Sequence, residues 1–372
     1  MIGGAPPGFD SALAGGPSSD WPYPVARVSR GLPLPQRLAA AVATVLRAAR
    51  RADVLYVQGL AGPEMVAVLV ARLLGKPLAL KIVGDNAWEY AIRNGLTQDG
   101  IDAFQHKRYP LKLRLVRGLV RAAARLATRL VVPSAYLERI VVGWGVPASR
   151  VVVIRNALTT TVATEAERAA AREAVRAELG VAGPLIVTSA RLYPWKNLDL
   201  LIRLVPRLPA GCTLAIVGDG PERERLERLS REIGVTERAR FTGGVAHAAV
   251  QQYLRAADVF VLNTRYEGLS HVVLEAMAAG APVVASAVGG NPEVIQHERN
   301  GLLVALNDDT GLGGAIERLL SDAGLASRLR RQAMQDVQAY RWDGLVERTA
   351  ATLESLAAPR AARASQAGAA AR

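Results

Sequence analysis

The sequence predicts an α/β protein of two doubly wound units, each with a parallel sheet covered by helices. Short apolar runs of strand length alternate with longer segments of helical periodicity along most of the chain. The chain has 372 residues, 50% of them hydrophobic, enough for two to three domains of about 150 residues with sizeable cores. The alternation stops at the polar, β-branched stretch Thr159–Val162 and restarts after Gly183 and Pro184, which divides the chain in two.

In the first unit, five short apolar runs are expected to be strands, with helices between them. The expected strands are Val25–Val28, Val54–Gln58, Leu78–Val83, Leu130–Pro133 and Val151–Arg155. The expected helices are Gln36–Arg51, Pro63–Leu74, the basic segment between Gln105 and Leu130, and Ala135–Gly143.

The two ends of the chain lack complete elements. Met1 to Gly4 have the pattern of a strand end that enters a glycine-rich turn, although no strand precedes them. A doubly wound sheet needs its first strand near the centre, so we expect this strand to be truncated, with the natural start upstream of Met1. Asp10–Tyr23 is expected to be a mobile loop beside the cleft, and residues 357–372 a disordered tail.

The second unit follows a helix at Thr164–Leu179 that Gly180 ends. Its expected strands are Leu185–Ser189, Thr213–Val217, Arg240–Phe241, Val259–Leu262, Pro282–Ala285 and Gly301–Val304. Its expected helices are Asp199–Arg207, Pro221–Ile233, His247–Ala256, His271–Ala279 and Gly311–Leu320. The helical stretch Ala326–Leu356 has no strand after it, so we divide the chain into domains 1–160 and 161–339 and expect about 340–356 to complete the first.

Composition excludes several classes of protein. Cys212 is the only cysteine, which excludes an internal disulfide framework and a cysteine-based zinc site and favours a cytoplasmic protein. The apolar runs are too short for a membrane span, and we expect no secretory signal. Aromatic residues make up 5% of the chain, too few to favour single-stranded nucleic acid binding by base stacking. The four histidines lack paired spacing, so we expect no metal site.

The net charge of +13 is concentrated in one segment. Eight basic residues and no acidic ones lie between Gln105 and Leu130: Lys107, Arg108, Lys112, Arg114, Arg117, Arg121, Arg125 and Arg129. Helical spacing puts a basic stripe beside an apolar track that includes Leu111, Leu115 and Leu119. Two interpretations stay open: a solvated helix face packed on a sheet, or a surface that meets anionic lipid or a phosphate-bearing substrate. No helix-turn-helix or zinc-finger spacing accompanies the stripe, so duplex DNA is not expected as a partner.

Two loops of the second unit carry features of an anion site. Arg191 and Lys196 follow the strand Leu185–Ser189, at the sheet edge where open α/β folds bind ligands. Two cations there would suit a diphosphate, although they could also be an ordinary surface pair. Gly218 and Gly220 follow the strand Thr213–Val217 and would let a ligand approach the backbone; a plain tight turn is the alternative.

The segment Tyr266–Met277 is the most specific signal in the chain. Glu267 follows the strand Val259–Leu262, and Ser270 is expected to cap the next helix. The backbone N–H groups of Gly268, Leu269, Ser270 and His271 would then form an anion site at a helix start. Glu275 lies about five residues, or about 7.5 Å, into that helix. Two carboxylates around a phosphate site would bracket a sugar nucleotide.

This segment resembles the E-x7-E motif of the retaining glycosyltransferase family 4, formerly group 1, which has the GT-B fold of two Rossmann-like domains facing across a cleft. Arg191 with Lys196, the Gly218–Pro221 turn, and the runs Gly280–Ser286 and Gly289–Glu293 follow in the family's order. The resemblance covers about Pro184–Asn300 strongly and the first half loosely. It implies that Arg191 and Lys196 clamp the donor diphosphate, Glu267 holds the donor sugar, the amides of Leu269 and Ser270 face phosphate, and Glu275 binds ribose. It also implies retention of configuration without a metal or another cofactor.

The first half departs from the family. Gly84 and Asp85 stand after a strand where many relatives carry a histidine near the sugar, so that role has no evident carrier. Asp85 is expected either to orient substrate hydroxyls or to cap a helix, and Trp88 and Glu89 are further candidates for acceptor binding. Of the family's glycine-rich acceptor loop only Gly3 and Gly4 are present, and Asn156 is the one residue kept of a Pro-Asn-Gly turn.

These features together predict a metal-independent enzyme that moves a hexose from a nucleoside diphosphate sugar to an acceptor hydroxyl. The basic segment suggests an acceptor at the inner membrane face, such as a lipid-linked sugar or another cell-envelope glycan, for a cytoplasmic and peripherally bound protein. One alternative keeps the fold but makes the protein a sugar-nucleotide epimerase or a phosphorylase. The other is a non-enzymatic basic protein that binds a lipid surface or nucleic acid.

Overall fold

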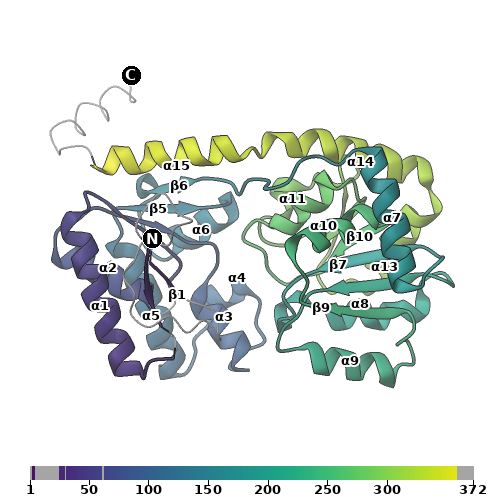
Figure 1. Cartoon of the computed structure of the whole chain (residues 1–372). Coiled ribbons are helices and arrows are strands. Elements are labelled where there is room, and N and C mark those ends of the chain that lie inside the picture. Colours follow the sequence, from purple (N-terminus) through teal and green to yellow (C-terminus); the bar gives the residue numbers. More distant parts are fainter. Residues whose placement is uncertain (1, 5–24, 30, 61–62, 358–372) are drawn as a thin grey trace.

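The computed structural model describes residues 2–4, 25–29, 31–60 and 63–357. These residues form two α/β domains in which all the paired strands of the sheets are parallel (Figure 1). The fold class predicted from the alternation of short and long periodic segments is therefore confirmed. Met1, the expected loop Asp10–Tyr23 and residues 358–372 of the expected tail lie outside the described residues.

The N-terminal domain holds a four-stranded sheet in the order β3-β4-β5-β6 and a separate two-stranded sheet of β1 and β2. Its strands are β1 (Ile2–Gly4), β2 (Ala26–Val28), β3 (Leu55–Gln58), β4 (Leu78–Lys81), β5 (Arg129–Val132) and β6 (Val151–Val153). Its helices are α1 (Leu34–Arg51), α2 (Pro63–Leu73), α3 (Asn86–Arg93), α4 (Ile101–His106), α5 (Leu111–Leu126), α6 (Ala135–Gly143) and the 3₁₀ turn η1 (Ala148–Arg150). The expected single sheet is thus divided into two.

The C-terminal domain holds a six-stranded sheet in the order β12-β11-β10-β7-β8-β9. Its strands are β7 (Leu185–Ser189), β8 (Thr213–Val217), β9 (Ala239–Gly243), β10 (Val259–Leu262), β11 (Val283–Ser286) and β12 (Leu302–Val304). Its helices are α7 (Glu165–Leu179), α8 (Leu198–Leu204), α9 (Arg223–Glu232), α10 (His247–Ala256), α11 (His271–Ala278), α12 (Asn291–Val294), α13 (Asp309–Ser321), α14 (Ala323–Asp336) and the 3₁₀ turns η2 (Pro194–Lys196), η3 (Val205–Arg207) and η4 (Val337–Ala339).

The strand order of this sheet fixes where a ligand can bind. The chain adds β8 and β9 on one side of β7, and then β10, β11 and β12 on the other. The loops after β7 and β10 therefore leave the sheet at its switch point, where the order reverses. Open α/β sheets bind ligands in the crevice outside the carboxyl ends of such strands.

Local signals in the sequence set several helix ends. Thr164 and Glu167 form a reciprocal capping box at the start of α7, and Gly180 ends this helix in a left-handed conformation with φ of 66°. Ser134 caps α6 by accepting a hydrogen bond from the Leu137 amide at 3.2 Å. These boundaries agree with the sequence prediction within one residue because the capping chemistry is local.

The last helix, α15 (Trp342–Ala357), runs along the N-terminal domain, as Figure 1 shows. The Arg348 guanidinium donates a hydrogen bond to the Val153 carbonyl of β6 at 2.8 Å, and the Leu158 amide donates to the Tyr340 carbonyl at 2.8 Å. The chain therefore crosses back from the C-terminal domain, as expected from the sequence. The domain boundary between residues 160 and 161 stays a prediction.

Aromatic side chains join the two domains. Trp195 and Tyr266, from the loops after β7 and β10, belong to the same buried cluster as the core of the N-terminal domain. The ring of Trp88 on α3 lies 5.9 Å from that of Trp195 and 5.5 Å from that of Tyr266, measured between centroids. Because Trp195 and Tyr266 immediately precede Lys196 and Glu267, this packing fixes both loops against the N-terminal domain.

The basic segment differs from the single amphipathic helix that the sequence predicts. Its start forms the last turn of α4, its middle forms α5 after Pro110, and Arg129 already lies in β5. Its four regularly spaced arginines all donate hydrogen bonds to backbone carbonyls of neighbouring segments, at distances of 2.6 to 3.2 Å. These arginines are Arg117, Arg121, Arg125 and Arg129. These four arginines are therefore bound within the fold, whereas Lys107, Arg108, Lys112 and Arg114 are exposed. Whether the segment meets an anionic surface stays a prediction.

The apolar track of the same segment is the part that faces outward. Leu111, Leu115 and Leu119 follow each other at intervals of four on α5, and their side chains are 66%, 59% and 61% exposed. The buried face of α5 consists of Leu113, Val120, Ala123 and Ala124. Among the described residues, no helix is long and apolar enough to cross a bilayer.

Candidate functional site

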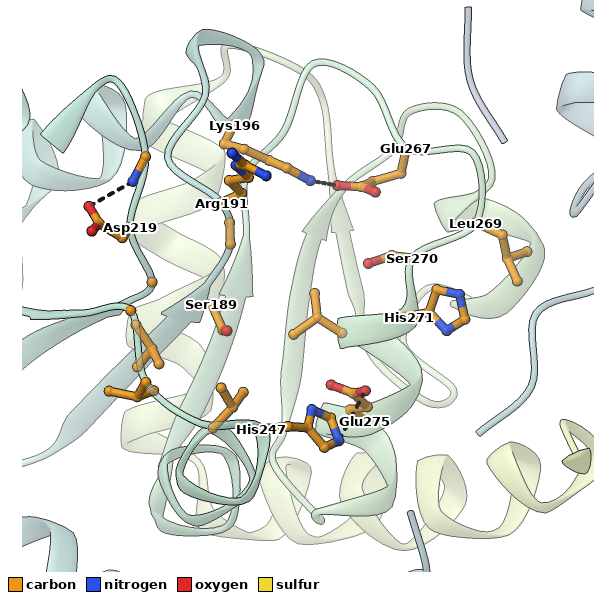
Figure 2. A pocket seen from close by; sticks show the side chains of 18 residues that line it. Ser189, Arg191, Lys196, Asp219, His247, Glu267, Leu269, Ser270, His271 and Glu275 are labelled. Atoms are coloured by element: carbon orange, nitrogen blue, oxygen red, sulfur yellow. Dashed lines mark hydrogen bonds and ion pairs between the residues drawn. The ribbon is translucent and has the colours of Figure 1, made fainter. Parts of the chain in front are cut away.

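A cavity of about 830 Å³ opens at the switch point of the six-stranded sheet. Eight of the nine donor-site residues predicted from the sequence line it: Arg191, Lys196, Gly218, Gly220, Glu267, Leu269, Ser270 and Glu275. Gly268 is the ninth and does not line the cavity. Figure 2 shows Arg191, Lys196 and Glu267 at one end and His247 and Glu275 at the other. The cavity therefore combines two cations and two carboxylates at the sheet edge where open α/β folds bind ligands.

Lys196 and Glu267 form an ion pair across the cavity mouth (Figure 2). Their side chains are only 17% and 14% exposed, so each charge is largely withdrawn from water. The Trp195 carbonyl accepts hydrogen bonds from the Arg265 amide at 2.7 Å and the Thr264 hydroxyl at 3.0 Å, which ties the two loops together. A diphosphate entering the cavity would meet a lysine whose position is already fixed.

Arg191 supplies the second cation, and its guanidinium is the more accessible of the two. It lies over the Tyr193 ring, with 5.1 Å between the guanidinium carbon and the ring centroid. Tyr193 in turn stacks on Trp195 with 4.5 Å between ring centroids. In the described part of the chain no carboxylate pairs with Arg191, so its charge is available to a ligand.

The turn after β8 packs against the turn that carries Arg191. A Cβ atom at Gly218, where φ is 136°, would lie 2.1 Å from the Ala190 carbonyl oxygen, and one at Gly220 would lie 2.6 Å from the Leu192 amide nitrogen. The Asp219 carboxylate also accepts a hydrogen bond from the Gly220 amide at 2.8 Å. These glycines therefore allow two loops to meet, in addition to lining the cavity.

A second pair of glycines positions Glu267. The Gly290 amide donates a hydrogen bond to the Glu267 carbonyl at 2.9 Å. A Cβ atom at Gly289 or Gly290 would lie 2.0 Å or 2.2 Å from the carbonyl oxygens of Glu267 and Gly268. The Gly289–Glu293 run noted in the sequence thus forms the base on which the Glu267 loop rests.

The start of α11 offers unpaired backbone donors to the cavity. Ser270 caps this helix, as predicted, and accepts a hydrogen bond from the Val273 amide at 3.4 Å. Among the described residues, the amides of Leu269, Ser270 and His271 donate to no protein acceptor. Free amides at a helix start attract anions. The buried Asn156 side chain, from the interdomain linker, donates to the Leu269 carbonyl at 2.8 Å and holds this turn in place.

Glu275 lies at the far end of the cavity, beside His247. The nearest atoms of the carboxylate and the imidazole, Oε1 and Nε2, are 3.9 Å apart. Burial raises the pKa of Glu275, and the neighbouring His247 and Gln251 oppose this effect. Such a carboxylate would accept hydrogen bonds from paired hydroxyl groups, as a ribose presents them.

The structure decides between the alternatives for Asp85 and corrects the expectation for Trp88. Asp85 is buried and caps α3: its carboxylate accepts hydrogen bonds from the amides of Ala87 and Trp88 and from the Gln105 side chain at 2.9 to 3.1 Å. The helix-cap alternative is therefore the observed one, and a direct contact of Asp85 with a substrate has no support. Trp88 is fully buried in the aromatic cluster, which corrects the expectation that it contacts the acceptor.

The remaining acceptor-site candidates divide into two groups. Glu89 is half-buried at the domain interface: a Cβ atom at Gly84 would lie 2.6 Å from its Oε1. Burial raises the pKa of Glu89, with Arg93, Asp85, Lys196 and Glu267 as weaker influences. Glu89 therefore lies close to the Lys196–Glu267 pair. Gly3 and Gly4 lie in β1 beside β2, and their role in acceptor binding stays a prediction.

The sequence analysis assigns no side-chain role to two cavity residues, His247 and His271, although it includes the backbone amide of His271 in the anion site. Both occupy the first position of a helix, α10 and α11, and both line the cavity. Their position after a strand and a short loop is the signal that would have identified them. Within the described residues, no group of three or more metal-ligating side chains occurs; the expectation that the reaction needs no metal stays a prediction.

Comparison with known families agrees with this arrangement. Residues 172–336 match the family model described as "Glycosyl transferases group 1", and residues 3–157 match the model described as "Glycosyl transferase 4-like domain". The two matches lie side by side and cover both domains. They support a glycosyltransferase of GT-B architecture.

Two curated relatives match this chain over less than half of their own length. The chain is 41% identical over 145 residues to the lipopolysaccharide core biosynthesis glycosyltransferase LpsD of Rhizobium meliloti, covering 39% of this chain and 41% of the relative. It is 38% identical over 178 residues to a GDP-mannose-dependent α-(1-6)-phosphatidylinositol monomannoside mannosyltransferase of Mycobacterium tuberculosis, covering 45% and 46%. Both relatives are glycosyltransferases, which supports a transferase.

A solved structure supports the fold over nearly the whole chain. Anabaena Alr3699/HepE in complex with UDP-glucose has a TM-score of 0.73 and 23% sequence identity, covering 89% of this chain and 86% of that one. This likeness shows the architecture: two Rossmann-like domains of the GT-B type.

Proposed function

We propose that the protein transfers a hexose from a nucleoside diphosphate sugar to an acceptor hydroxyl and retains the anomeric configuration. One observation carries this proposal. Arg191, Lys196, Glu267, Glu275 and the free amides at the start of α11 all line a single cavity at the sheet's switch point. Each group matches one part of a sugar nucleotide.

The proposed roles follow from the chemistry of each group. Arg191, Lys196 and the start of α11 bind the diphosphate, Glu275 accepts hydrogen bonds from the ribose hydroxyls, and Glu267 holds the donor sugar. In the reaction the bond between the anomeric carbon and the diphosphate oxygen breaks, and its electron pair leaves with the diphosphate. The acceptor oxygen bonds to that carbon on the same face, and its proton passes to the leaving phosphate. The two cations and the helix start stabilise the negative charge that develops there.

We also propose that the acceptor is a lipid-linked or cell-envelope glycan, and that the protein binds the cytoplasmic face of the membrane. The surface that supports this is the exposed leucine row of α5, Leu111, Leu115 and Leu119, and not the arginine stripe. A cavity of about 610 Å³ at the start of α5 is lined by Arg108, Tyr109, Arg114 and Arg117. Leucines beside basic side chains on one helix suit an anionic lipid surface.

Binding to vesicles tests the membrane proposal. Replacing Leu115 and Leu119 together by Glu should reduce co-sedimentation with phosphatidylglycerol-containing vesicles by at least tenfold, because both apolar side chains lose their contact with lipid. Val346→Glu, at an exposed apolar position on α15, is the matched control and should bind like the wild type. Equal binding of all three proteins would reject this surface.

A panel of sugar nucleotides tests the proposed reaction. A UDP-, GDP- or ADP-sugar present at 100 times its Kd should stabilise the protein by about 2.7 kcal/mol. Glu267→Gln should retain the fold and lose turnover, because Glu267 is a loop residue outside the core. If no nucleotide sugar raises the melting temperature, the proposed donor is wrong. If nucleotide sugars bind and turnover survives Glu267→Gln, the proposed role of Glu267 is wrong.

Two alternatives make different predictions in the same experiments. A sugar-nucleotide epimerase would convert the donor without needing an acceptor hydroxyl, whereas the proposed transferase releases nucleoside diphosphate in proportion to acceptor glycosylated. A non-enzymatic basic protein would keep its function in Glu267→Gln and Lys196→Ala variants.

A further inference from the structure

The N-terminal sheet carries a lysine that no part of the proposed reaction uses. Lys81 is the last residue of β4, at the carboxyl edge of the N-terminal sheet, and it pairs in register with Gln58 of β3 and Val131 of β5. Its side chain is half-buried. Within the described residues, Lys81 forms no ion pair and its ammonium donates no hydrogen bond.

The backbone places Lys81 against the donor site. Two residues after it, the Val83 carbonyl accepts a hydrogen bond from the Tyr266 hydroxyl at 3.2 Å. A Cβ atom at Gly268 would lie 2.3 Å from the same carbonyl oxygen, so the end of β4 touches the loop that leads into α11. Lys81 is also the charged group that most lowers the pKa of His271, the first residue of α11, where partial burial is the main cause.

The charges around the cleft leave Lys81 without a partner. Lys196 is paired with Glu267, and Arg191 lies beside Lys196 in the cavity (Figure 2). Burial lowers the pKa of Lys81, and no acidic neighbour offsets this. Withdrawing an ammonium from water without a counter-ion is unfavourable, so a protein gains stability when such a group meets an anion.

We infer that Lys81 binds an anionic group, such as a phosphate, carried by the acceptor. The inference rests on the proposed function, because it assumes that the cavity of the C-terminal domain holds the donor. With the donor diphosphate bound by Arg191, Lys196 and α11, Lys81 would remain available to a group on the acceptor, beside the loop that leads into α11. The acceptor would then be an anionic glycan or a phosphate-bearing alcohol.

Anion binding to the nucleotide-saturated protein tests this inference. Inorganic phosphate is titrated calorimetrically at low ionic strength into the full-length protein, with and without the nucleoside diphosphate of the best sugar donor. The wild type should bind phosphate in the presence of the nucleotide. Lys81→Gln should weaken that binding at least tenfold and change nucleotide affinity less than twofold. Lys76→Gln, two residues before the start of the same strand, is the matched control and should behave like the wild type.

Each other outcome overturns the inference. If the nucleotide-bound wild type binds no phosphate, Lys81 does not form an anion site. If Lys81→Gln weakens nucleotide binding as much as phosphate binding, Lys81 binds the donor diphosphate and not the acceptor. If no nucleoside diphosphate binds the wild type, the proposed donor site is wrong. In that case, equal phosphate affinity of the wild type and Lys81→Gln rejects the role of Lys81 separately. Circular dichroism of both variants verifies that they are folded.

Discussion

At the scale of single residues, the structure separates groups that serve a ligand from groups that serve the fold. Glu275 and Asp85 are both carboxylates removed from water, and burial raises the pKa of each. Asp85 is hydrogen-bonded to two amides and a glutamine side chain. Glu275 instead faces a cavity with only His247 and Gln251 close to its carboxylate. A buried acid with unused acceptor capacity is the better candidate for ligand binding.

Glu275→Gln should weaken nucleoside diphosphate binding by about tenfold or more, because a hydrogen bond to a charged group contributes about 1.5–3 kcal/mol. Since burial raises the pKa of Glu275 above the ordinary 4.5, wild-type affinity should begin to fall on acidification at a higher pH than for an ordinary glutamate. A raised pKa in the folded state means that the ionised form destabilises the fold above that pKa, so the variant should melt at the same or a higher temperature. Calorimetric titration between pH 4.5 and 8 and thermal melts measure both effects.

The control for this prediction is Glu224→Gln, an exposed residue of α9 that lies outside the cavity. It should leave nucleotide affinity and its pH dependence unchanged. Glu275 does not bind the nucleotide if Glu275→Gln has the same nucleotide affinity as the wild type. The same conclusion follows if the affinity of this variant falls with decreasing pH as steeply as that of the wild type.

The sequence identifies the cavity residues because their spacing follows from one strand-loop-helix unit. Glu267 and Glu275 are separated by a loop and one helix start, and Ser270 marks that start by its capping preference. The position of Trp88 could not be predicted in this way. Its neighbours Trp195 and Tyr266 are more than 100 residues away along the chain, and only the packing of the two domains brings them together.

At the scale of elements, boundaries set by local chemistry are the ones that the sequence predicts. The strands β7, β8 and β10 and the helices α6 and α10 begin and end at the predicted residues. The basic segment fails this test for a physical reason. An arginine stripe has the same sequence pattern whether its partners are water, lipid or backbone carbonyls. Here the partners are backbone carbonyls of other segments, including those of Phe104, Trp144 and Ser149.

The capping role of Asp85 leads to a prediction about α3. Asp85→Ala removes an N-cap acceptor and one hydrogen-bond partner of Gln105, and it should lower the free energy of unfolding by about 1–3 kcal/mol. Glycosyl transfer per folded molecule should stay within about threefold of the wild type, because Asp85 does not line the donor cavity. Urea unfolding and activity at matched folded concentrations measure the two quantities.

Ser134→Ala removes the cap of α6 and serves as the comparison, since Ser134 is also buried and also lies outside the cavity. Both variants should have a lower free energy of unfolding, and both should keep nearly wild-type activity per folded molecule. A loss of turnover above tenfold in Asp85→Ala with unchanged stability would instead restore the substrate-orienting role that the sequence allows.

At the scale of the whole molecule, the function depends on how the two domains are held together. The donor cavity is lined by residues of the C-terminal domain, whereas Lys81 and Glu89 belong to β4 and α3 of the other. Besides the aromatic cluster, polar contacts cross the interface at Asn156 and Tyr266. A third contact comes from Glu293 of α12, whose carboxylate accepts hydrogen bonds from the amides of Ala135 and Tyr136 at 3.0 and 2.8 Å. The sequence contains Glu293 within a recognisable run but gives no sign of a partner in the other domain.

Glu293 places a negative charge at the start of α6 in the N-terminal domain, where the helix dipole and two unpaired amides favour it. Glu293→Ala removes both hydrogen bonds and should loosen the interface. We expect a larger radius of gyration in small-angle scattering and a kcat at least tenfold lower, because transfer needs groups from both domains. Nucleoside diphosphate affinity should change less than twofold, since its cavity lies within one domain. Glu298→Ala, which breaks an exposed ion pair with Arg318 inside the C-terminal domain, should change none of these quantities. A wild-type kcat and radius of gyration in Glu293→Ala would mean that the remaining contacts, including the aromatic cluster, Asn156 and Tyr266, hold the domains together without Glu293.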